Sequence, residues 1–582
     1  MGKYLIEENK VNRGQMLLFP LAFAFVNSFV YYFISQERYI YFWDYYHYWA
    51  KYQNLGDLMI HSPLKAFSEI WRTLRYEDYN LLPVLFLMPI RLLFGTSRLT
   101  YVLAVANVYA FPAAVLSAFL VTRIVSSDKK KSYIPIGMAL ATSLLFPQYW
   151  IPVLFGFPDV AGVVVIYVIF LLVVIRPFEE QKMASLVLLG VLLAFLIMLR
   201  RWYAYWVVSF FVAIAAQRLL ALFPRHHFRI RNYLPAARNL IIAGMISSGF
   251  FLLAATPIAK RMITTDYADI YSAYKMTDAI IPFLKDLSFH LGLFTSSLFA
   301  AALAFGIVQR RSRDLSVFLL FHLVCVVFLF SRVQSFSVQH YYLIIPSMVL
   351  SISVLAVSVS SYLHKVAARS IVLAGYIAAL ALQFWLVFVP QSSGRIDGIA
   401  PIFSRDRHYP MVRNDLGEIR KLLDALETNS HGGEDGVYVI ASSTIFSDDI
   451  LRNACRAFDY PQLFCNRILG SSHVDKRDGF PKNFLSAGYV VVAEPVQYHL
   501  RPEDQRVIGI LAEQMHLKSG IGSSFDALNY EFLLDNNVNV HIYKKMKPFD
   551  SDALQQLEYL YVTYYPDKKE IFTIPGIHKG SD

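Results

Sequence analysis

The sequence is poor in charged residues. They make up 17% of its 582 residues, hydrophobic residues make up 56%, and the mean hydropathy is +0.42. This composition excludes a single soluble domain and is typical of a polytopic membrane protein. The chain also lacks a signal-peptide cleavage pattern before its first apolar run, so we expect that run to be a retained helix. It has no repeat of about 20–50 residues and no low-complexity tract, which argues against a repeat architecture.

Cysteine is scarce, and its positions leave two alternatives open. Cys325 lies inside an apolar run, whereas Cys455 and Cys465 lie ten residues apart in the polar C-terminal part. The latter two can form a disulfide if that part is extracytoplasmic, and two unpaired thiols are the alternative. The formal net charge of +11 would suit a nucleic-acid partner. Most cationic residues flank apolar runs, however, where they set topology and meet anionic lipid, so we expect membrane lipids and no nucleic acid.

Eleven apolar runs have roughly the length of a helix that crosses ~30 Å of hydrocarbon. Lys3, Lys10 and Arg13 precede the first run and place the N-terminus in the cytoplasm, and the other predicted cytoplasmic loops are also basic and short. Eleven spans then put the C-terminus outside, in what we expect to be a bacterial plasma (inner) membrane. The predicted runs are residues 16–34, 99–122, 133–150, 160–175, 183–199, 202–222, 239–256, 291–308, 315–330, 341–360 and 371–389.

A twelfth apolar run, residues 81–94, has only about 14 residues and contains two prolines and Arg91. This length suits a helix that lies in the membrane interface better than a span. Counting it as a span would also place the cluster Lys129-Lys130-Lys131 outside, against the positive-inside rule. We therefore predict a polar and aromatic first outer loop that continues to about Asn80, within an outer region 35–98 that includes interfacial helices.

The composition becomes that of a soluble domain after Pro390. Residues 416–426 have helical spacing, residues 436–441 and 489–493 have strand composition, and residues 538–543 alternate like a strand. The sequence thus predicts a membrane domain over 1–390 and an extracytoplasmic α/β domain over 391–582. The second domain lacks a glycine-rich phosphate loop, metal-ligand spacing and a nucleophile elbow, which favours a cap or partner-binding role.

A dense aromatic stretch, residues 42–49, follows the first predicted span and contains Asp44 and His47 among six aromatic side chains. Aromatic residues are enriched at the membrane interface, so one interpretation is an anchor with an incidental carboxylate. The other interpretation is an active site that meets an amphiphile with a polar head. The topology favours the second, because further polar groups fall on the same predicted face of the membrane. These are Glu77, Asp78, Asn80, Asp159, Arg200, Arg201, Arg332, His340 and Tyr341.

The pair Arg200-Arg201 ends a span on the outer side, where the positive-inside rule does not call for it. Two guanidinium groups at an interface can bind lipid headgroups or the phosphate of a specific ligand. His340 alone would be read as an interfacial histidine bonded to backbone. A carboxylate base with external arginines suits group transfer from a phosphate leaving group. Nucleotide donors are cytosolic, so an outward-facing site needs a donor already carried across the membrane, such as a lipid-linked phosphate.

The order of these motifs resembles that of the GT-C glycosyltransferases, a class that includes protein O-mannosyltransferases, lipid A aminoarabinose transferases and oligosaccharyltransferases. The resemblance covers about the first 390 residues. Asp44 is similar to the acidic motif of the first outer loop, and Asp159 to an acid of the second. The other matching segments are 77–83 with 94–95, the basic pair in 199–203, and 339–343 with Pro346.

The resemblance implies inverting transfer of a sugar from a polyprenyl-phosphate donor to a glycan, lipid or protein acceptor, with Asp44 as general base and the other outer polar residues at the donor. It also leaves open a divalent metal ion held by Asp44 and Asp159. Two features depart from the pattern: Tyr45 follows Asp44 where many members have a second acid, and no two-acid cluster surrounds Asp159. The alternative functions are a secondary transporter or lipid flippase, which needs polar groups near the midplane or paired broken helices, and a non-catalytic scaffold.

Overall fold

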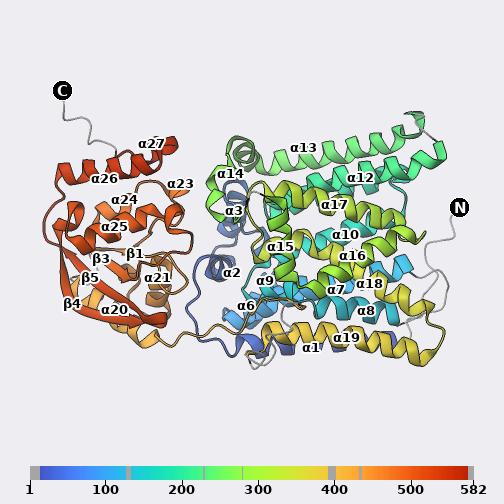
Figure 1. Cartoon of the computed structure of the whole chain (residues 1–582), viewed down its shortest axis with the longest axis horizontal. Coiled ribbons are helices and arrows are strands. Elements are labelled where there is room, and N and C mark those ends of the chain that lie inside the picture. The colour runs from blue at the N-terminus through green and yellow to red at the C-terminus, as the bar shows by residue number, and fades with distance from the viewer. Residues whose placement is uncertain are drawn as a thin grey trace. The chain divides into compact units, whose positions relative to one another are not determined.

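The computed structural model describes residues 13–125, 133–226, 230–277, 279–390, 402–430 and 435–574. The chain separates into two compact units (Figure 1). Unit 1 comprises Met1–Glu37, Asp44–Thr265 and Thr277–Pro410, and unit 2 comprises Arg38–Trp43, Asp266–Met276 and Met411–Asp582. Unit 2 therefore gathers two short segments from the N-terminal half in addition to the C-terminal part of the chain.

Unit 1 is a bundle of helices. Among the described residues, seven helical segments are long and apolar enough to cross a membrane, or up to nine if each of two bent pairs is one span. Together with the short C-terminal sheet, this confirms the predicted fold class, a helical polytopic membrane protein with a C-terminal domain. The helices are α1 (Arg13–Ile34), α2 (Trp43–His61), α3 (Pro63–Tyr76), α4 (Leu82–Leu85), α5 (Met88–Phe94), α6 (Arg98–Val105), α7 (Phe111–Val125), α8 (Ile134–Leu144), α9 (Pro147–Leu154), α10 (Ala161–Ile175), α11 (Met183–Leu199), α12 (Tyr203–His226), α13 (Leu234–Thr264), α15 (Ile280–Leu291), α16 (Leu293–Val308), α17 (Arg313–Ser331), α18 (Ile345–Tyr362) and α19 (Val366–Phe388).

Two of the eleven predicted runs belong to bent helix pairs. The run 133–150 breaks by 51° between α8 and α9, because Pro147 holds the preceding Phe146 in an extended conformation. The segment 260–290 lies between the predicted runs 239–256 and 291–308, and it contains the end of α13 and all but the last residue of α15. Helix α15 meets α16 at 108°, with Gly292 at a φ of 80° in the corner. The two runs 160–175 and 183–199 are shorter apolar helices, α10 and α11.

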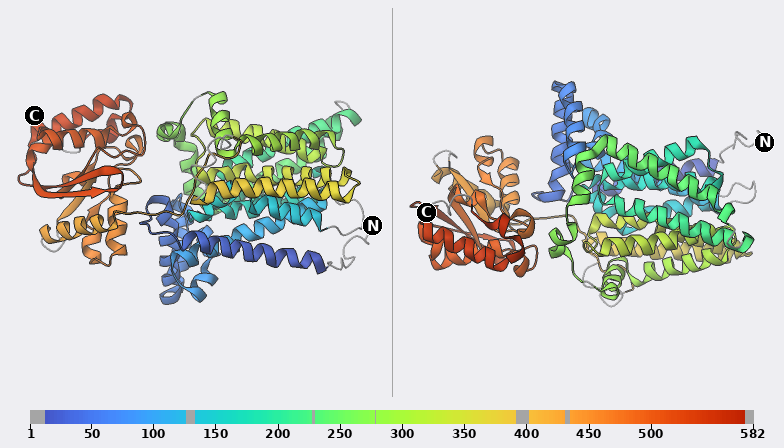
Figure 2. Two further views of the ribbon diagram at one scale, coloured as in Figure 1. Left: turned by 60° about the horizontal axis from the view of Figure 1, so that its bottom comes forward. Right: turned by 90° about the horizontal axis from the view of Figure 1, so that it is seen from above.

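The first outer region differs from the expected loop. It contains two helices, α2 and α3, which lie at one end of the bundle and across the direction of the long helices (Figure 2). Helix α3 has two faces: Ala66 and Ile70 are buried, whereas Leu64, Phe67 and Trp71 are exposed. An amphipathic helix of this kind is typical of a membrane interface, and its polar face keeps it from appearing as a continuous apolar run. The predicted helix 81–94 is present as two short helices, α4 and α5.

Unit 2 contains a five-stranded mixed sheet in the order β2-β1-β3-β5-β4 (Figure 1). Strands β2, β1 and β3 are parallel, and β5 runs antiparallel to both β3 and β4. The three strand segments expected from the sequence are β1, β3 and β5. The elements are α14 (Tyr267–Ile270), α20 (Leu416–Asn429), β1 (Gly436–Ile440), α21 (Asp448–Ala457), α22 (Gln462–Cys465), β2 (Ile468–Leu469), α23 (Asp475–Asp478), α24 (Lys482–Leu485), β3 (Ala487–Glu494), α25 (Arg506–Leu517), β4 (Phe525–Leu534), β5 (Val538–Lys545), α26 (Ser551–Tyr564) and α27 (Lys569–Phe572).

Cys455 and Cys465 form a disulfide between α21 and α22, with their Cα atoms 5.6 Å apart. The structure thus decides between the two alternatives that the sequence left open. Both cysteines are fully buried, so the bridge closes a loop beside the core of the sheet.

Candidate active site

Asp44 lies in the first turn of α2, and its side chain is half-buried. The hydroxyl of Tyr79 donates a hydrogen bond to Asp44 Oδ2 at 3.1 Å. A carboxylate in the first turn also gains from the partial positive charge of the helix N-terminus. His47 lies one turn further on α2, is exposed, and places its ring 5.3 Å from the ring of Tyr79. The structure thus groups Asp44, His47 and Tyr79.

Arg200 and Asp159 form a buried ion pair, with 2.8 Å between Arg200 Nε and Asp159 Oδ1. The side chains are 5% and 0% exposed, respectively. Arg200 also donates a hydrogen bond to the Tyr48 hydroxyl at 2.8 Å, and its guanidinium lies over the Tyr79 ring at 4.3 Å. Burial alone would lower the pKa of Arg200, but the charge of Asp159 raises it well above its ordinary value. Arg200 is therefore a permanent buried cation, held by protein groups.

Tyr79 connects Asp44 with the buried Arg200–Asp159 pair, because its hydroxyl donates to Asp44 and its ring lies under the Arg200 guanidinium. Burial raises the pKa of Tyr48, and the charges of Arg200, Asp159 and Asp44 all act on its hydroxyl. The carboxylates predicted from two separate outer segments, Asp44 and Asp159, thus lie within electrostatic range of one phenol.

Asp78 lies between two guanidinium groups. Arg201 Nη1 is 2.7 Å from its Oδ2, and Arg261 Nη2 is 2.5 Å from its Oδ1. The side chains of Arg201 and Arg261 are 20% and 40% exposed, so this group differs from the buried pair of Arg200. Sequence reasoning missed Arg261, which lies in the last turn of α13. The signal was available: a basic dipeptide, Lys260-Arg261, at the predicted outer end of a span, as for Arg200 and Arg201.

Glu77 and Asn80 have structural partners. Glu77 accepts from Lys51 at 2.8 Å and from Arg72 at 2.6 Å. Burial alone would raise the pKa of Glu77, but these two cations hold it below its ordinary value. Asn80 is buried, donates to the carbonyl of Met198 and accepts from the backbone N–H of Leu82, so it ties the start of α4 to the end of α11.

His340 and Tyr341 lie in a turn, Val338–Leu343, that precedes α18. The His340 ring is buried 5.3 Å from the ring of Trp202 and caps the turn through Ser337. Burial and the charges of Arg200 and Arg201 lower the pKa of His340 to about 3, so the imidazole is neutral at physiological pH. Tyr341 is buried with its ring 6.1 Å from that of His290.

Arg332 is exposed and packs its guanidinium over the ring of Phe328, one turn earlier on α17, at 4.8 Å. That contact does not connect it to the Arg200 and Arg201 groups. Arg332 is thus one of the residues singled out from the sequence that the described contacts do not group with Asp44, Arg200 or Arg201.

The two carboxylates considered for a divalent metal ion, Asp44 and Asp159, both contact other side chains. Asp159 is already paired with Arg200, whose fixed positive charge opposes a second cation at the same carboxylate. Within the part of the chain that the structure describes, no group of three or more His, Cys, Asp or Glu side chains is arranged to hold a metal ion.

The aromatic stretch 42–49 divides between the two units at Trp43 and Asp44. In unit 2, the backbone N–H of Trp43 donates to Asp449, and its ring lies 4.8 Å from that of His499. In unit 1, Asp44 begins the group described above.

No family model matches the sequence, and no curated protein matches it. Among solved structures, the chain is similar to two of ArnT from Cupriavidus metallidurans. One is bound to undecaprenyl phosphate, with 12% identity, a TM-score of 0.48, and 91% of this chain and 98% of that chain covered. The other is the apo state, with 12% identity, a TM-score of 0.47 and the same coverage. At 12% identity and TM-scores below 0.5, these matches assign neither a family nor an activity to this chain.

Proposed function

We propose that the chain is an integral membrane glycosyltransferase that moves a sugar from a polyprenyl-phosphate donor to a glycan, lipid or protein acceptor. The observation that carries the proposal is the Asp44 carboxylate, half-buried and oriented by Tyr79, in one assembly with a buried cation, Arg200. The more exposed cations Arg201 and Arg261 meet at Asp78. A base, an orienting phenol and accessible guanidinium groups are what transfer from a phosphate leaving group requires.

Asp44 acts as the general base in this proposal. Tyr79 holds Oδ2, and Oδ1 has no hydrogen-bond partner among the described residues. An acceptor hydroxyl can donate to Oδ1 and lose its proton there while its oxygen attacks the anomeric carbon. The bond from that carbon to the phosphate oxygen breaks on the opposite face, so the sugar is inverted and the lipid phosphate leaves with the bonding electrons.

Arg201 and Arg261 stabilise the departing phosphate. The two guanidinium groups and the Asp78 carboxylate have a net charge of +1, and both arginines are partly exposed. A phosphate can therefore take over donors that Asp78 now accepts from, and guanidinium groups bind phosphate in a bidentate manner. Arg200 is a positioning residue instead, because its guanidinium is paired with the Asp159 carboxylate and its planar face lies over the Tyr79 ring.

The lipid part of the donor is consistent with the helices beside the site. The apolar face of α3, with Leu64 at 86%, Phe67 at 62% and Trp71 at 51% exposure, fits the boundary between headgroups and acyl chains. By the positive-inside rule this end of the bundle faces the outside of a bacterial plasma membrane, together with the C-terminal domain.

The test of the base is Asp44→Asn in the full-length protein, with Asp57→Asn on the same helix as the matched control. Transfer is followed as the change in lipid-linked sugars that accumulate in cells with and without each variant. Loss of a general base should lower the transfer rate by about 10²–10⁴-fold. Undecaprenyl phosphate should still bind, because Asp44 does not contact the phosphate. Full transfer by Asp44→Asn would refute the role of Asp44 as base. If the lipid-linked sugars were the same in cells with and without the protein, a transporter or a scaffold would be favoured.

The test of the phosphate site is the affinity of the purified protein for undecaprenyl phosphate. Arg261→Ala removes one charge-assisted contact and should weaken binding by about tenfold or more. Arg332→Ala is the control, because this arginine is exposed and packs on Phe328. An equal loss in both variants would indicate general attraction of anionic lipid rather than a site.

A further inference from the structure

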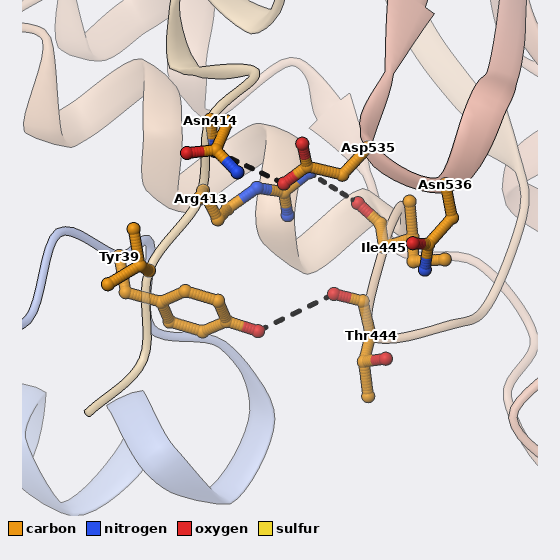
Figure 3. A pocket seen from close by; sticks show the side chains of 8 residues that line it. Tyr39, Arg413, Asn414, Thr444, Ile445, Asp535 and Asn536 are labelled. Carbon is orange, nitrogen blue, oxygen red and sulfur yellow. Dashed lines mark hydrogen bonds between the residues drawn. The ribbon is translucent and has the colours of Figure 1, made fainter. Parts of the chain in front are cut away.

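Unit 2 contains a cavity of about 510 Å³ that belongs to no site described above (Figure 3). Four chain segments line it: Tyr39 from the segment 38–43, Arg413 and Asn414 before α20, Thr444 after β1, and Asp535 and Asn536 from the turn between β4 and β5. The volume lies within the range of about 300–1,000 Å³ that is usual for small-molecule sites.

The walls of this cavity are held together by hydrogen bonds between the segments. The Arg413 guanidinium donates to Asp415 at 2.8 and 2.7 Å and to the carbonyl of Ile445 at 2.7 Å. The backbone N–H of Asn414 donates to Asp535 at 3.2 Å, and that of Asp535 donates to Asp415 at 2.9 Å. A preformed wall lowers the cost of ordering a ligand site.

The segment 38–43 is part of this framework. Arg38 donates its backbone N–H to the carbonyl of Met411, and its own carbonyl accepts from Arg413, so the two strands of chain pair in parallel. The Tyr39 hydroxyl reaches the carbonyl of Thr444 at 3.5 Å, which turns the ring along the cavity wall (Figure 3). An aromatic face is thus fixed at one side of a mostly polar space.

The polar side chains at the rim are available to a ligand. The side chains of Asn414, Thr444 and Asn536 are exposed and make no hydrogen bond to the residues that the structure describes. A side-chain amide offers both donors and an acceptor, and a threonine hydroxyl offers one donor and two acceptors. These amides and this hydroxyl together suit a ligand whose own polar groups both donate and accept hydrogen bonds.

The charges of the cavity exclude other ligand classes. The Arg413 side chain is 3% exposed and paired with Asp415, so its charge is already compensated, and Asp535 adds a negative charge that repels anions. A metal ion would need several acidic or imidazole ligands, and the described residues include no such group. Only Val412 and Ile445 are aliphatic, so an apolar ligand would leave the amides unpaired.

We propose that this cavity binds an uncharged carbohydrate. Sugar hydroxyls pair with the amides of Asn414 and Asn536, with Thr444 and with Asp535, and the apolar face of the sugar ring packs on Tyr39. The inference does not rest on the proposed transfer reaction, because binding in unit 2 requires no catalysis.

The experiment measures binding of D-glucose, D-galactose, D-mannose, N-acetyl-D-glucosamine and L-arabinose to the detergent-solubilised full-length protein by saturation-transfer NMR. We expect at least one of them to bind with a dissociation constant on the order of 1 mM. Asn414→Ala and Asn536→Gly each remove an exposed amide, and glycine tolerates the φ of 59° at position 536. Each should weaken binding by about 3- to 10-fold, without a change in unfolding temperature.

The ring of Tyr39 has its own comparison. Tyr39→Phe should keep most of the binding and Tyr39→Ala should lose it, whereas Tyr530→Ala, at an exposed tyrosine on β4 outside the cavity, should bind like the parent. Asp44→Asn should also leave sugar binding unchanged, which separates this site from the proposed active site. Binding of none of the five sugars at about 20 mM, unchanged binding in the two asparagine variants, or tighter binding of glucose 6-phosphate than of glucose would overturn the proposal.

Discussion

Replacing Arg200 by methionine should strongly destabilise the helical bundle of unit 1. Methionine roughly keeps the length of the side chain but removes the charge that neutralises Asp159, whose side chain is fully buried. It also removes the hydrogen bond to Tyr48 and the cation–π contact with Tyr79. We therefore expect an effect much larger than that of a surface arginine.

The magnitude follows from the burial of both partners. Removing one member of a buried ion pair leaves an uncompensated charge and costs about 3–5 kcal/mol. That cost includes the lost hydrogen bond to Tyr48, because the substitution removes the whole guanidinium group. Replacing both partners, as in Arg200→Met with Asp159→Leu, removes the buried charges together, and such replacements are often close to neutral. The double variant should therefore recover most of the loss, with a coupling energy of about 2–4 kcal/mol between the two sites.

The assay is unfolding of the purified protein in mixed micelles by titration with sodium dodecyl sulfate, followed by tryptophan fluorescence. Arg332→Met is the control, because Arg332 is exposed and should change the free energy of unfolding by less than about 0.5 kcal/mol. A loss below about 1 kcal/mol in Arg200→Met, or additive losses in the double variant, would show that the pair is not the buried unit described here.

Three further predictions concern other parts of the molecule. Changing Cys455 and Cys465 together to alanine should destabilise unit 2 by about 3 kcal/mol, the value for a loop of this length, seen as a lower unfolding temperature. Burial alone would lower the pKa of His473, but its bond to Asp448 raises it. That ion pair therefore stabilises unit 2 fully below the unfolded pKa of about 6.5, and its contribution is lost as the pH rises through the raised folded pKa. His473→Gln should accordingly flatten the fall in unfolding temperature above about pH 6.5. Asp78→Asn should free two guanidinium groups and tighten undecaprenyl phosphate binding severalfold; weaker binding would show that Asp78 organises them.

The helices could be predicted from the sequence where a simple property marks them. Long apolar runs identified the spans, because lipid-facing and buried residues are both apolar. Helix α3 was not predicted because half of its surface is polar, although Leu64, Phe67 and Trp71 repeat with helical spacing. Strand β4 was not predicted for a related reason, because most of its residues are exposed and its apolar residues do not alternate with polar ones.

The candidate site was only partly predictable, because topology places residues on one side of a membrane but does not pair them. Asp44, Asp159 and Arg200 were grouped by the alternation of spans alone. That Arg200 is buried against Asp159 while Arg201 is partly exposed could not be read from two adjacent arginines. The end of α11 decides it: Arg200 follows Leu199 in an extended conformation, so successive side chains point to opposite sides.

The buried pair supports the proposed general base, Asp44, from the interior of the bundle. Asp44 is the second residue of α2, where the chain passes from unit 2 to unit 1. A carboxylate at the start of a helix would be mobile without further contacts. Tyr79 restrains it, but a phenol held only by Asp44 would itself be free to turn. Arg200, locked by Asp159 and Tyr48, holds the Tyr79 ring from the other side. In the proposed reaction, a charge held by protein groups thereby helps to set the direction of the Asp44 carboxylate, and general-base catalysis requires such pre-organisation.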